Sequence, residues 1–220
     1  MYNESLIGTL SLIMIVTSVS AVEARNLRVA AFAYAAQALL ICGLILAFAV
    51  NNSALYWWAG VAFVTKAVIT PWLLLLYVRR TADREVRAII GFGPSVIVAS
   101  IILVSFYNLT HAYADFLAPS KLATEGVFRT NLAVALTVFV IGLYAILSRR
   151  DAIKTVIGLC LLENAVHLSL VSLAPGIRET ALVGIATEVV ITVYLLLYII
   201  SGIYQKFGST DTYKLSELHW

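Results

Sequence analysis

Long apolar stretches alternate with short polar connections along this sequence, and this pattern limits what the chain can fold into. A helix needs about 20 mostly apolar residues to cross a bilayer. Hydrophobic residues make up 61% of the 220 residues and charged residues 12%, whereas soluble domains are about 25% charged. We therefore expect an all-α integral membrane protein with seven transmembrane helices in the lipid bilayer. The predicted spans are Leu6–Val22, Leu27–Val50, Leu55–Val78, Ala88–Tyr107, Asn131–Leu147, Ala152–Ala174 and Thr180–Tyr204.

The distribution of positive charge predicts an orientation for these spans. Cytoplasmic connections of membrane proteins are enriched in lysine and arginine. Alternate connections carry eleven of the 15 lysines and arginines, so we expect these connections in the cytoplasm. The N-terminus is then outside and the C-terminus cytoplasmic. The eleven residues are Arg25, Arg28, Arg79, Arg80, Arg84, Arg87, Arg149, Arg150, Lys154, Lys206 and Lys214.

The sequence contains no pattern typical of a metal centre or a nucleic-acid site. Its two cysteines, Cys42 and Cys160, fall inside apolar spans and do not form the CxxC pairs of zinc and iron–sulfur sites. The formal net charge of +3 is small and spread along the chain, which does not indicate a nucleic-acid partner. We predict no catalytic residue, no metal ligand and no cofactor within this chain.

Ionisable residues inside the apolar spans are the main functional signal. A charge at the centre of a membrane helix is unfavourable by roughly 2.5–3.5 kcal/mol on insertion scales unless it is paired or hydrated. Glu163 and His167 are four residues apart, so they share one helical face. Lys66 and Glu188 lie in two other spans. All four are candidate proton-handling residues, with an interhelical hydrogen bond as the alternative role of His167.

Polar and helix-breaking residues accompany these four. Gln37, Asn164 and Thr187 are possible supporting polar groups, although such side chains also hold membrane helices together by hydrogen bonds. Pro71 follows Lys66 by five residues and predicts a helix break, because proline removes a backbone hydrogen bond. A break there can free carbonyl groups for polar partners or water.

The first three spans can be aligned with the last three. Lys66 then falls opposite Glu188, and Gln37 falls opposite Glu163. We interpret this as two parallel three-helix units joined by the fourth helix, with chance matching of leucine runs as the alternative. The predicted regions are the first unit at residues 1–80, the fourth helix and an outer loop at 81–130, the second unit at 131–208 and a cytoplasmic tail at 209–220.

Gly158-Leu159 and Asn164-Ala165 in the sixth span, with Glu188 in the seventh, form a pattern that resembles the NuoK-type subunit of complex I. That family has three helices, with one membrane glutamate in the second and one in the third. Glu188 takes the place of the third-helix glutamate. In the second helix, Cys160 takes the place of the glutamate, and the acid appears three residues later as Glu163. At 1.5 Å per residue, the acid keeps its face but shifts by about 4.5 Å.

Fragments spread along most of the chain carry a second resemblance. They are Phe63-Val64-Thr65-Lys66 with Pro71, Phe92-Gly93-Pro94, Leu162-Glu163-Asn164 with His167-Leu168, and Gly184-Ile185-Ala186-Thr187. These fragments resemble the hydrogenase-4 component E family, membrane subunits of formate hydrogenlyase-type complexes. The resemblance implies a multi-pass subunit of a prokaryotic cytoplasmic membrane, lying between antiporter-like subunits and the subunit that anchors the hydrogenase. It implies that the nickel–iron centre and the iron–sulfur clusters belong to peripheral partner subunits.

The functional hypothesis combines the membrane charges with this resemblance. Lys66, Glu163, His167 and Glu188 would form part of a hydrated path that relays protons across the membrane plane during redox turnover. A low dielectric makes each charge sensitive to its neighbours, so protonation of one site alters the next. Two other functions remain open. One is a subunit of a cation/proton antiporter complex without a redox module, and the other is a structural anchor whose charges only fix helix register.

Overall fold

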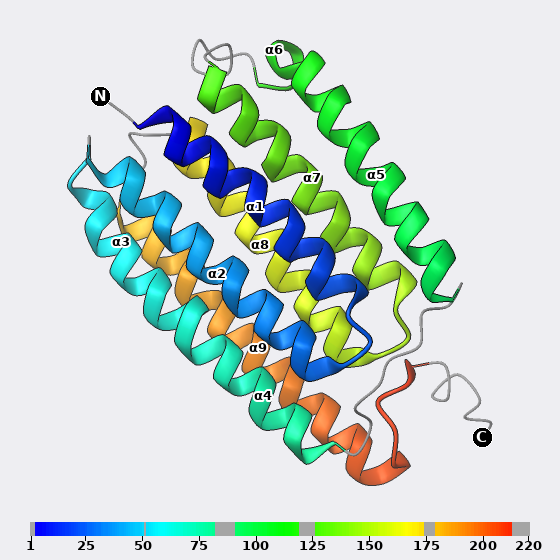
Figure 1. Ribbon diagram of the computed structural model, residues 1–220. Helices are drawn as coiled ribbons and strands as arrows, with labels where there is room; N and C mark the ends of the chain where they lie inside the picture. The colour runs from blue at the N-terminus through cyan, green and yellow to red at the C-terminus, as the bar shows by residue number, and fades with distance from the viewer. Residues whose placement is uncertain (1–2, 51, 82–90, 119–125, 174–178, 213–220) are drawn as a thin grey trace.

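The computed structural model describes the chain except for residues 1–2, 51, 82–90, 119–125, 174–178 and 213–220 (Figure 1). The described residues form helices joined by short connections. The elements are α1 (Glu4–Glu23), α2 (Leu27–Ala49), α3 (Ala54–Ala62), the π-helix η1 (Phe63–Ile69), α4 (Thr70–Arg80), α5 (Phe92–Ala112), α6 (Ala114–Leu117), α7 (Gly126–Ser148), α8 (Ala152–Leu173) and α9 (Glu179–Phe207).

The predicted all-α class and number of spans are confirmed. Among the described residues, seven helices are long and apolar enough to cross a membrane. Three elements, α3, η1 and α4, together form one of these spans, the 27-residue segment Ala54–Arg80. Figure 1 shows α1 and α7 beginning at the same end of the bundle, and α2 and α8 running back toward that end.

Two helices begin at other residues than predicted, and the local backbone and side chains explain where they begin. α1 begins at Glu4, because the side-chain oxygen of Asn3 accepts a hydrogen bond from the backbone N–H of Leu6. α5 begins at Phe92 after Gly91, whose φ of 83° favours glycine. Residues 88–90 of the predicted fourth span lie outside the described part.

The connection expected between the fourth and fifth spans is partly helical. α5 continues to Ala112, and the short helix α6 follows it. α7 begins at Gly126, five residues before the predicted start. The Arg129 guanidinium links the start of α7 to the end of α5, because it donates to the carbonyl oxygens of His111 (2.7 Å) and Ala112 (3.3 Å). A cation is favourable at a helix C-terminus.

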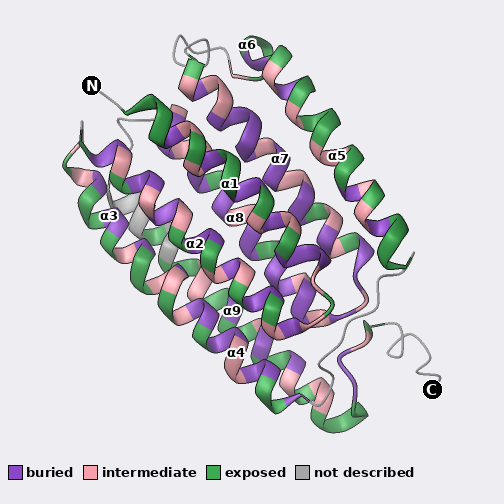
Figure 2. Cartoon of the chain, in the orientation of Figure 1, coloured by how far each residue is buried: buried purple, intermediate pink, exposed green. Residues whose placement is uncertain are grey.

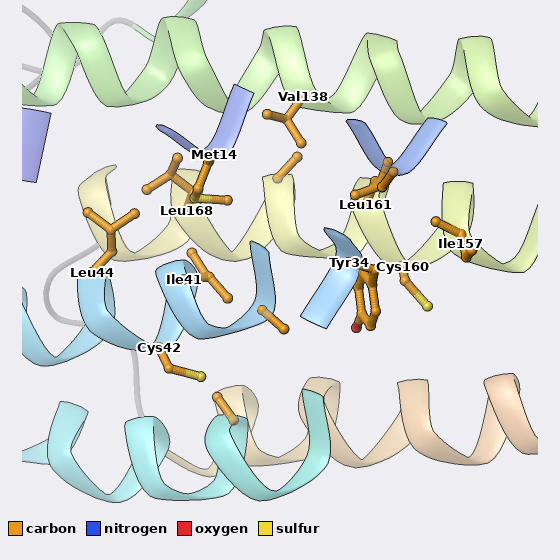
Figure 3. Packing of buried hydrophobic residues seen from close by; sticks show 14 of the residues in the cluster. Met14, Tyr34, Ile41, Cys42, Leu44, Val138, Ile157, Cys160, Leu161 and Leu168 are labelled. Carbon is orange, nitrogen blue, oxygen red and sulfur yellow. The ribbon is translucent and has the colours of Figure 1, made fainter. Parts of the chain in front are cut away.

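The core lies where α1, α2, α7 and α8 meet. α7 packs along α8, α1 packs against α2 and α7, and α2 packs against α8, while α9 packs against α3, α4 and α8. Of the most apolar part of each helix, 61% is buried in α8 but only 11% in α5 and 17% in the Thr187–Phe207 part of α9. Figure 2 shows many exposed residues along α5. Figure 3 shows Met14, Ile41 and Leu168 in the shared apolar interior. The surfaces of α5 and α9 therefore remain largely open within this chain.

The backbones of α7 and α8 approach each other closely at two glycines. A Cβ atom added to Gly142 would lie 2.9 Å from the carbonyl oxygen of Gly158, and one added to Gly158 would lie 3.0 Å from the carbonyl oxygen of Gly142. Small residues allow membrane helices to pack at such short range. This contact holds α8, which carries Glu163, Asn164 and His167, against α7.

The helix break predicted at Pro71 takes the form of a π-helix. The backbone N–H of Thr70 donates to the carbonyl oxygen of Thr65, five residues earlier, and the Thr70 hydroxyl donates to the same oxygen at 2.9 Å. Proline has no N–H to continue an α-helical ladder, and α4 restarts with Pro71 in its first turn. π-helical turns are often found at functional sites, and this one contains Lys66.

A polar cluster joins the helices at the end of the bundle where α1 finishes. Arg149 Nη2 lies 2.5 Å from Glu23 Oε1 and 2.8 Å from Ser95 Oγ, and Ser95 donates to Glu23 at 2.9 Å. The ammonium group of Lys154 donates to the carbonyl oxygens of Ala21 (2.6 Å) and Val22 (2.9 Å). Lys154, which the charge distribution places among the basic residues on the cytoplasmic side, is buried in the first turn of α8.

The first residues of the predicted tail dock on this chain itself. The backbone N–H of Ala152 donates to the carbonyl oxygen of Thr210, and that of Thr212 donates to Arg150. The Thr210 hydroxyl donates to Asp151 Oδ2. The tail residues 213–220 lie outside the described part.

Candidate functional site

Lys66 lies within the third span, and its side chain is 1% exposed. An ammonium group has three N–H donors and no acceptor. A buried lysine therefore needs three acceptors nearby, or its charge is strongly unfavourable.

One face of α8 supplies all three acceptors. Lys66 Nζ lies 2.9 Å from Glu163 Oε1, 2.9 Å from Asn164 Oδ1 and 2.6 Å from His167 Nδ1. Asn164 and His167 are fully buried, and the Glu163 side chain is 10% exposed. The structure thus brings together Lys66, Glu163 and His167 as predicted, and adds Asn164 as a direct contact.

His167 Nδ1 has two competing partners, Lys66 Nζ and the Glu163 carbonyl oxygen at 3.0 Å. Without a hydrogen, Nδ1 accepts from the Lys66 ammonium group. With a hydrogen, it can donate to the Glu163 carbonyl. The two arrangements differ by one proton that crosses a short hydrogen bond. The geometry is therefore suited to passing a proton between a lysine and a histidine.

Two further polar residues extend the site toward α1. Asn164 Nδ2 donates to Gln37 Oε1 at 3.0 Å, and Gln37 Nε2 donates to Ser18 Oγ at 2.7 Å. All three side chains are fully buried. Gln37 and Asn164 were predicted as possible supporting polar groups, and both lie in the site.

Several buried atoms of the site have no hydrogen-bond partner among the described residues. They include Glu163 Oε2, His167 Nε2 and Trp58 Nε1. The Trp58 ring packs against the imidazole of His167, with 5.2 Å between ring centroids. Buried water commonly satisfies such groups in proteins, and water next to His167 and Glu163 would extend the set of proton acceptors.

Glu188 and Thr187 lie on α9, outside the set of groups that contact Lys66. Both are exposed within this chain, whereas Glu163 is nearly buried. A carboxylate on an open face of a membrane helix is unfavourable next to lipid. The position of Glu188 therefore favours contact with another polar surface, such as a neighbouring subunit.

Sequence reasoning missed Ser18 and Trp58, which are buried beside the predicted residues. Serine and tryptophan are common in membrane helices, so neither type stands out in an apolar span. The fixed distance between Ser18 and Gln37 depends on how α1 and α2 pack, and only the structure shows it.

The part of the chain that the structure describes contains no group of three or more histidine, cysteine, aspartate or glutamate side chains that could hold a metal ion. Cys42 and Cys160 are buried with free thiols. The Tyr34 ring lies beside Cys160 in the core (Figure 3). The chemistry that the described site can support is proton exchange among a lysine, a carboxylate and an imidazole.

The chain is similar to known membrane subunits. Residues 130–220 match the protein family described as NADH-ubiquinone/plastoquinone oxidoreductase chain 4L, the NuoK-type family. Over its whole length, the chain is 28% identical to hydrogenase-4 component E of Escherichia coli (strain K12), and 99% of each chain is covered. The same values apply to hydrogenase-4 component E of Shigella flexneri.

An uncharacterized protein of Mycobacterium tuberculosis is 24% identical over 93% of this chain and 92% of its own length. No solved structure matches the chain. The two resemblances predicted from sequence motifs are confirmed, and they support a membrane subunit related to those of complex I.

Proposed function

We propose that this chain is a membrane-arm subunit of a complex I-related, formate hydrogenlyase-type nickel–iron hydrogenase. In this role, Lys66, Glu163, His167 and Glu188 belong to a proton-translocation path coupled to redox turnover. The main support for this path is the contact of the buried Lys66 Nζ with Glu163, Asn164 and His167 at 2.6–2.9 Å. The similarity to hydrogenase-4 component E along 99% of the chain supports the choice of complex.

The path has two parts in this proposal. Lys66, Glu163 and His167 exchange a proton inside the chain, because their donor and acceptor atoms lie within hydrogen-bond distance. Glu188 continues the path toward a neighbouring subunit, because its carboxylate lies on the open side of α9. Charges in a low dielectric interact strongly. A change of protonation at Glu188 would therefore influence the ion pair between Lys66 on η1 and Glu163 on α8.

The proposed architecture has two parallel three-helix units, residues 1–80 and 131–208, joined by the fourth helix. The packing of α1 against α7 and of α2 against α8 supports this pairing of units. The N-terminus is outside and the C-terminus cytoplasmic in this proposal, which is supported by the basic residues at the ends of α4 and α9, Arg79, Arg80 and Lys206, and directly after α7, Arg149 and Arg150. The membrane in question is the cytoplasmic membrane of a prokaryote.

The proposed partners are antiporter-like membrane subunits, the membrane subunit that anchors the hydrogenase, and peripheral hydrogenase and iron–sulfur subunits. The nickel–iron centre and iron–sulfur clusters belong to those peripheral subunits. The open surfaces of α5 and α9 give two such neighbours room to bind.

A pull-down of the tagged chain from native membranes in mild detergent tests the proposed complex. We expect mass spectrometry to find hydrogenase and antiporter-like subunits together, with hydrogen-evolving activity in the eluate. Recovery of antiporter-like subunits without any hydrogenase would overturn the redox assignment and favour a cation/proton antiporter complex.

Proton translocation by the assembled complex tests the path itself. Among the complexes that assemble, we expect Glu163→Gln to lower proton movement per turnover while hydrogen evolution continues. Unchanged proton movement in that assembled variant would favour a structural anchor instead.

A further inference from the structure

A single chain of hydrogen bonds connects α1 to the ammonium group of Lys66. Ser18 Oγ donates to the carbonyl oxygen of Met14 at 2.6 Å and accepts from Gln37 Nε2 at 2.7 Å. Gln37 Oε1 accepts from Asn164 Nδ2 at 3.0 Å, and Asn164 Oδ1 accepts from Lys66 Nζ at 2.9 Å. Ser18, Gln37 and Asn164 are each fully buried, so water does not replace these bonds.

The direction of this chain is fixed at both ends. A backbone carbonyl only accepts hydrogen bonds, and an ammonium group only donates them. Between these ends stand one hydroxyl and two amides, each of which can face either way. Only one arrangement pairs every donor with an acceptor: the Ser18 hydroxyl points to Met14, and each amide turns its oxygen toward Lys66.

We infer that Ser18 is a positioning residue for Lys66, because it sets the orientation of the Gln37 and Asn164 amides. This inference rests on the proposed function of Lys66 and deepens it. With Ser18 in place, Asn164 presents an oxygen to the ammonium group. Without the hydroxyl, Gln37 Nε2 loses its acceptor, and the ammonium group of Lys66 alone then holds both amides in this orientation. An Asn164 amide turned around would direct an N–H donor at an ammonium group, which is repulsive.

Ser11 provides a matched control on the same helix. It is fully buried like Ser18, and its hydroxyl also donates to a carbonyl four residues earlier, Ile7, at 2.9 Å. Its side-chain partner is Asn131 Oδ1 at 2.5 Å, not a residue of the Lys66 site. A serine-to-alanine change therefore removes the same atoms at both positions, but only Ser18 is linked to Lys66.

The functional test compares Ser18→Ala, Ser18→Thr and Ser11→Ala in the complete assembled complex. We expect Ser18→Ala to lower the rate of proton translocation about fivefold, the effect of roughly 1 kcal/mol from one lost hydrogen bond. Ser18→Thr, which keeps the hydroxyl, should restore most of this loss, and Ser11→Ala should resemble the unsubstituted complex. Equal losses in Ser18→Ala and Ser11→Ala would overturn the inference in favour of a packing effect.

A second measurement reports the amide orientation without relying on proton transport. In the isolated full chain in lipid nanodiscs, NMR of ¹⁵N-asparagine-labelled protein can follow the Asn164 side-chain amide, assigned by its loss in Asn164→Ala. We expect this signal to shift in Ser18→Ala and in Gln37→Met, and to stay in place in Ser11→Ala. An unmoved Asn164 signal in both of the first two variants would refute the positioning role.

The two measurements separate the inference from the proposed function. If Glu163→Gln leaves proton transport intact while the Asn164 signal still moves in Ser18→Ala, the proposed path fails and the positioning relationship stands. If Glu163→Gln stops transport while Ser18→Ala matches Ser11→Ala in both assays, the path stands and the inference fails.

Discussion

Lys66 on η1 and Glu163 on α8 form a buried ion pair, with 2.9 Å between Nζ and Oε1. The two residues come from opposite halves of the sequence, so the pair ties the third span to the sixth. Removal of one member of a buried pair leaves the other charged and without a partner, which is more unfavourable than the loss of both.

The first prediction concerns this pair. Lys66→Met should lower the free energy of unfolding in detergent by roughly 3–5 kcal/mol, because Glu163 is left without its cation. The double variant Lys66→Met/Glu163→Gln should recover much of that stability, yet proton transport should stay low. Thermal unfolding of four purified proteins, the unsubstituted chain, Lys66→Met, Glu163→Gln and the double variant, measures the stability effect. Additive losses in the double variant would contradict an energetic coupling between the two residues.

The second prediction concerns Glu188. Glu188→Gln should leave the complex assembled but lower the rate of proton translocation roughly 100-fold or more, in the range of an acid–base group. Vesicles that contain the complex and a pH-sensitive dye give the measurement. Asp115→Asn is a suitable control, since Asp115 is an exposed carboxylate on α6 outside the spans. Full translocation by assembled Glu188→Gln complexes would remove this residue from the path.

The third prediction concerns the glycine contact between α7 and α8. Gly142→Ala should destabilise the chain by about 1–3 kcal/mol, as overpacking does elsewhere, because the new Cβ atom would lie 2.9 Å from a backbone oxygen. Gly8→Ala is the control, since nothing lies within 4 Å of its Cβ position. Unfolding in detergent compares the two. Equal stability of Gly142→Ala and Gly8→Ala would show that α7 and α8 can move apart at this contact without a loss of stability.

The fourth prediction concerns Asp151, which precedes α8 and accepts hydrogen bonds from the backbone N–H groups of Ile153 and Lys154. Burial raises the pKa of Asp151 above its ordinary value of 3.8, with the Thr210 hydroxyl acting in the opposite direction. The native state then holds this proton more tightly than the unfolded chain does. The contribution of Asp151 to the free energy of unfolding is therefore greatest below pH 3.8 and falls as pH rises through the native pKa.

Two variants separate this pH effect from helix capping. Asp151→Asn should keep the cap and lose the pH dependence, since asparagine caps helices as well as aspartate does. Relative to Asp151→Asn, Asp151→Ala should be destabilised by roughly 0.5–2 kcal/mol at all pH values. Unfolding midpoints from pH 4 upward provide the measurement. An Asp151→Asn protein with the same pH profile as the unsubstituted chain would assign the effect to another group.

The sequence predicted the helical class because apolar runs of membrane length admit few other structures. It also predicted Lys66, Glu163, His167 and Glu188 as one proton path, because ionisable residues are rare in such runs, and the structure brings the first three of them together. The structure adds the relative depth and rotation of separate helices, which depend on packing. That is why the sequence did not anticipate the contact of Lys66 with Asn164 or the place of Glu188 away from it.

The sequence pattern also did not predict the local backbone geometry of the third span. Pro71 predicted a break in the third span, but the π-helix before it depends on where Thr70 and Thr65 can bond. The burial of charges near the helix ends was likewise not predicted. Lys154 was counted only among the basic residues on the cytoplasmic side, whereas the structure shows its ammonium group capping the end of α1.

The contact between Gly142 and Gly158 also bears on how the protein can move. The backbones of α7 and α8 are so close at these glycines that neither helix can slide along the other by one residue. Such a shift would bring a side chain into contact with the backbone of the opposing helix. α7 and α8 therefore behave as a stiff hairpin that keeps Glu163 and His167 at constant height. Displacements that accompany turnover would fall on α5 and α9, the least buried helices, and spin labels on those two are the best reporters of motion.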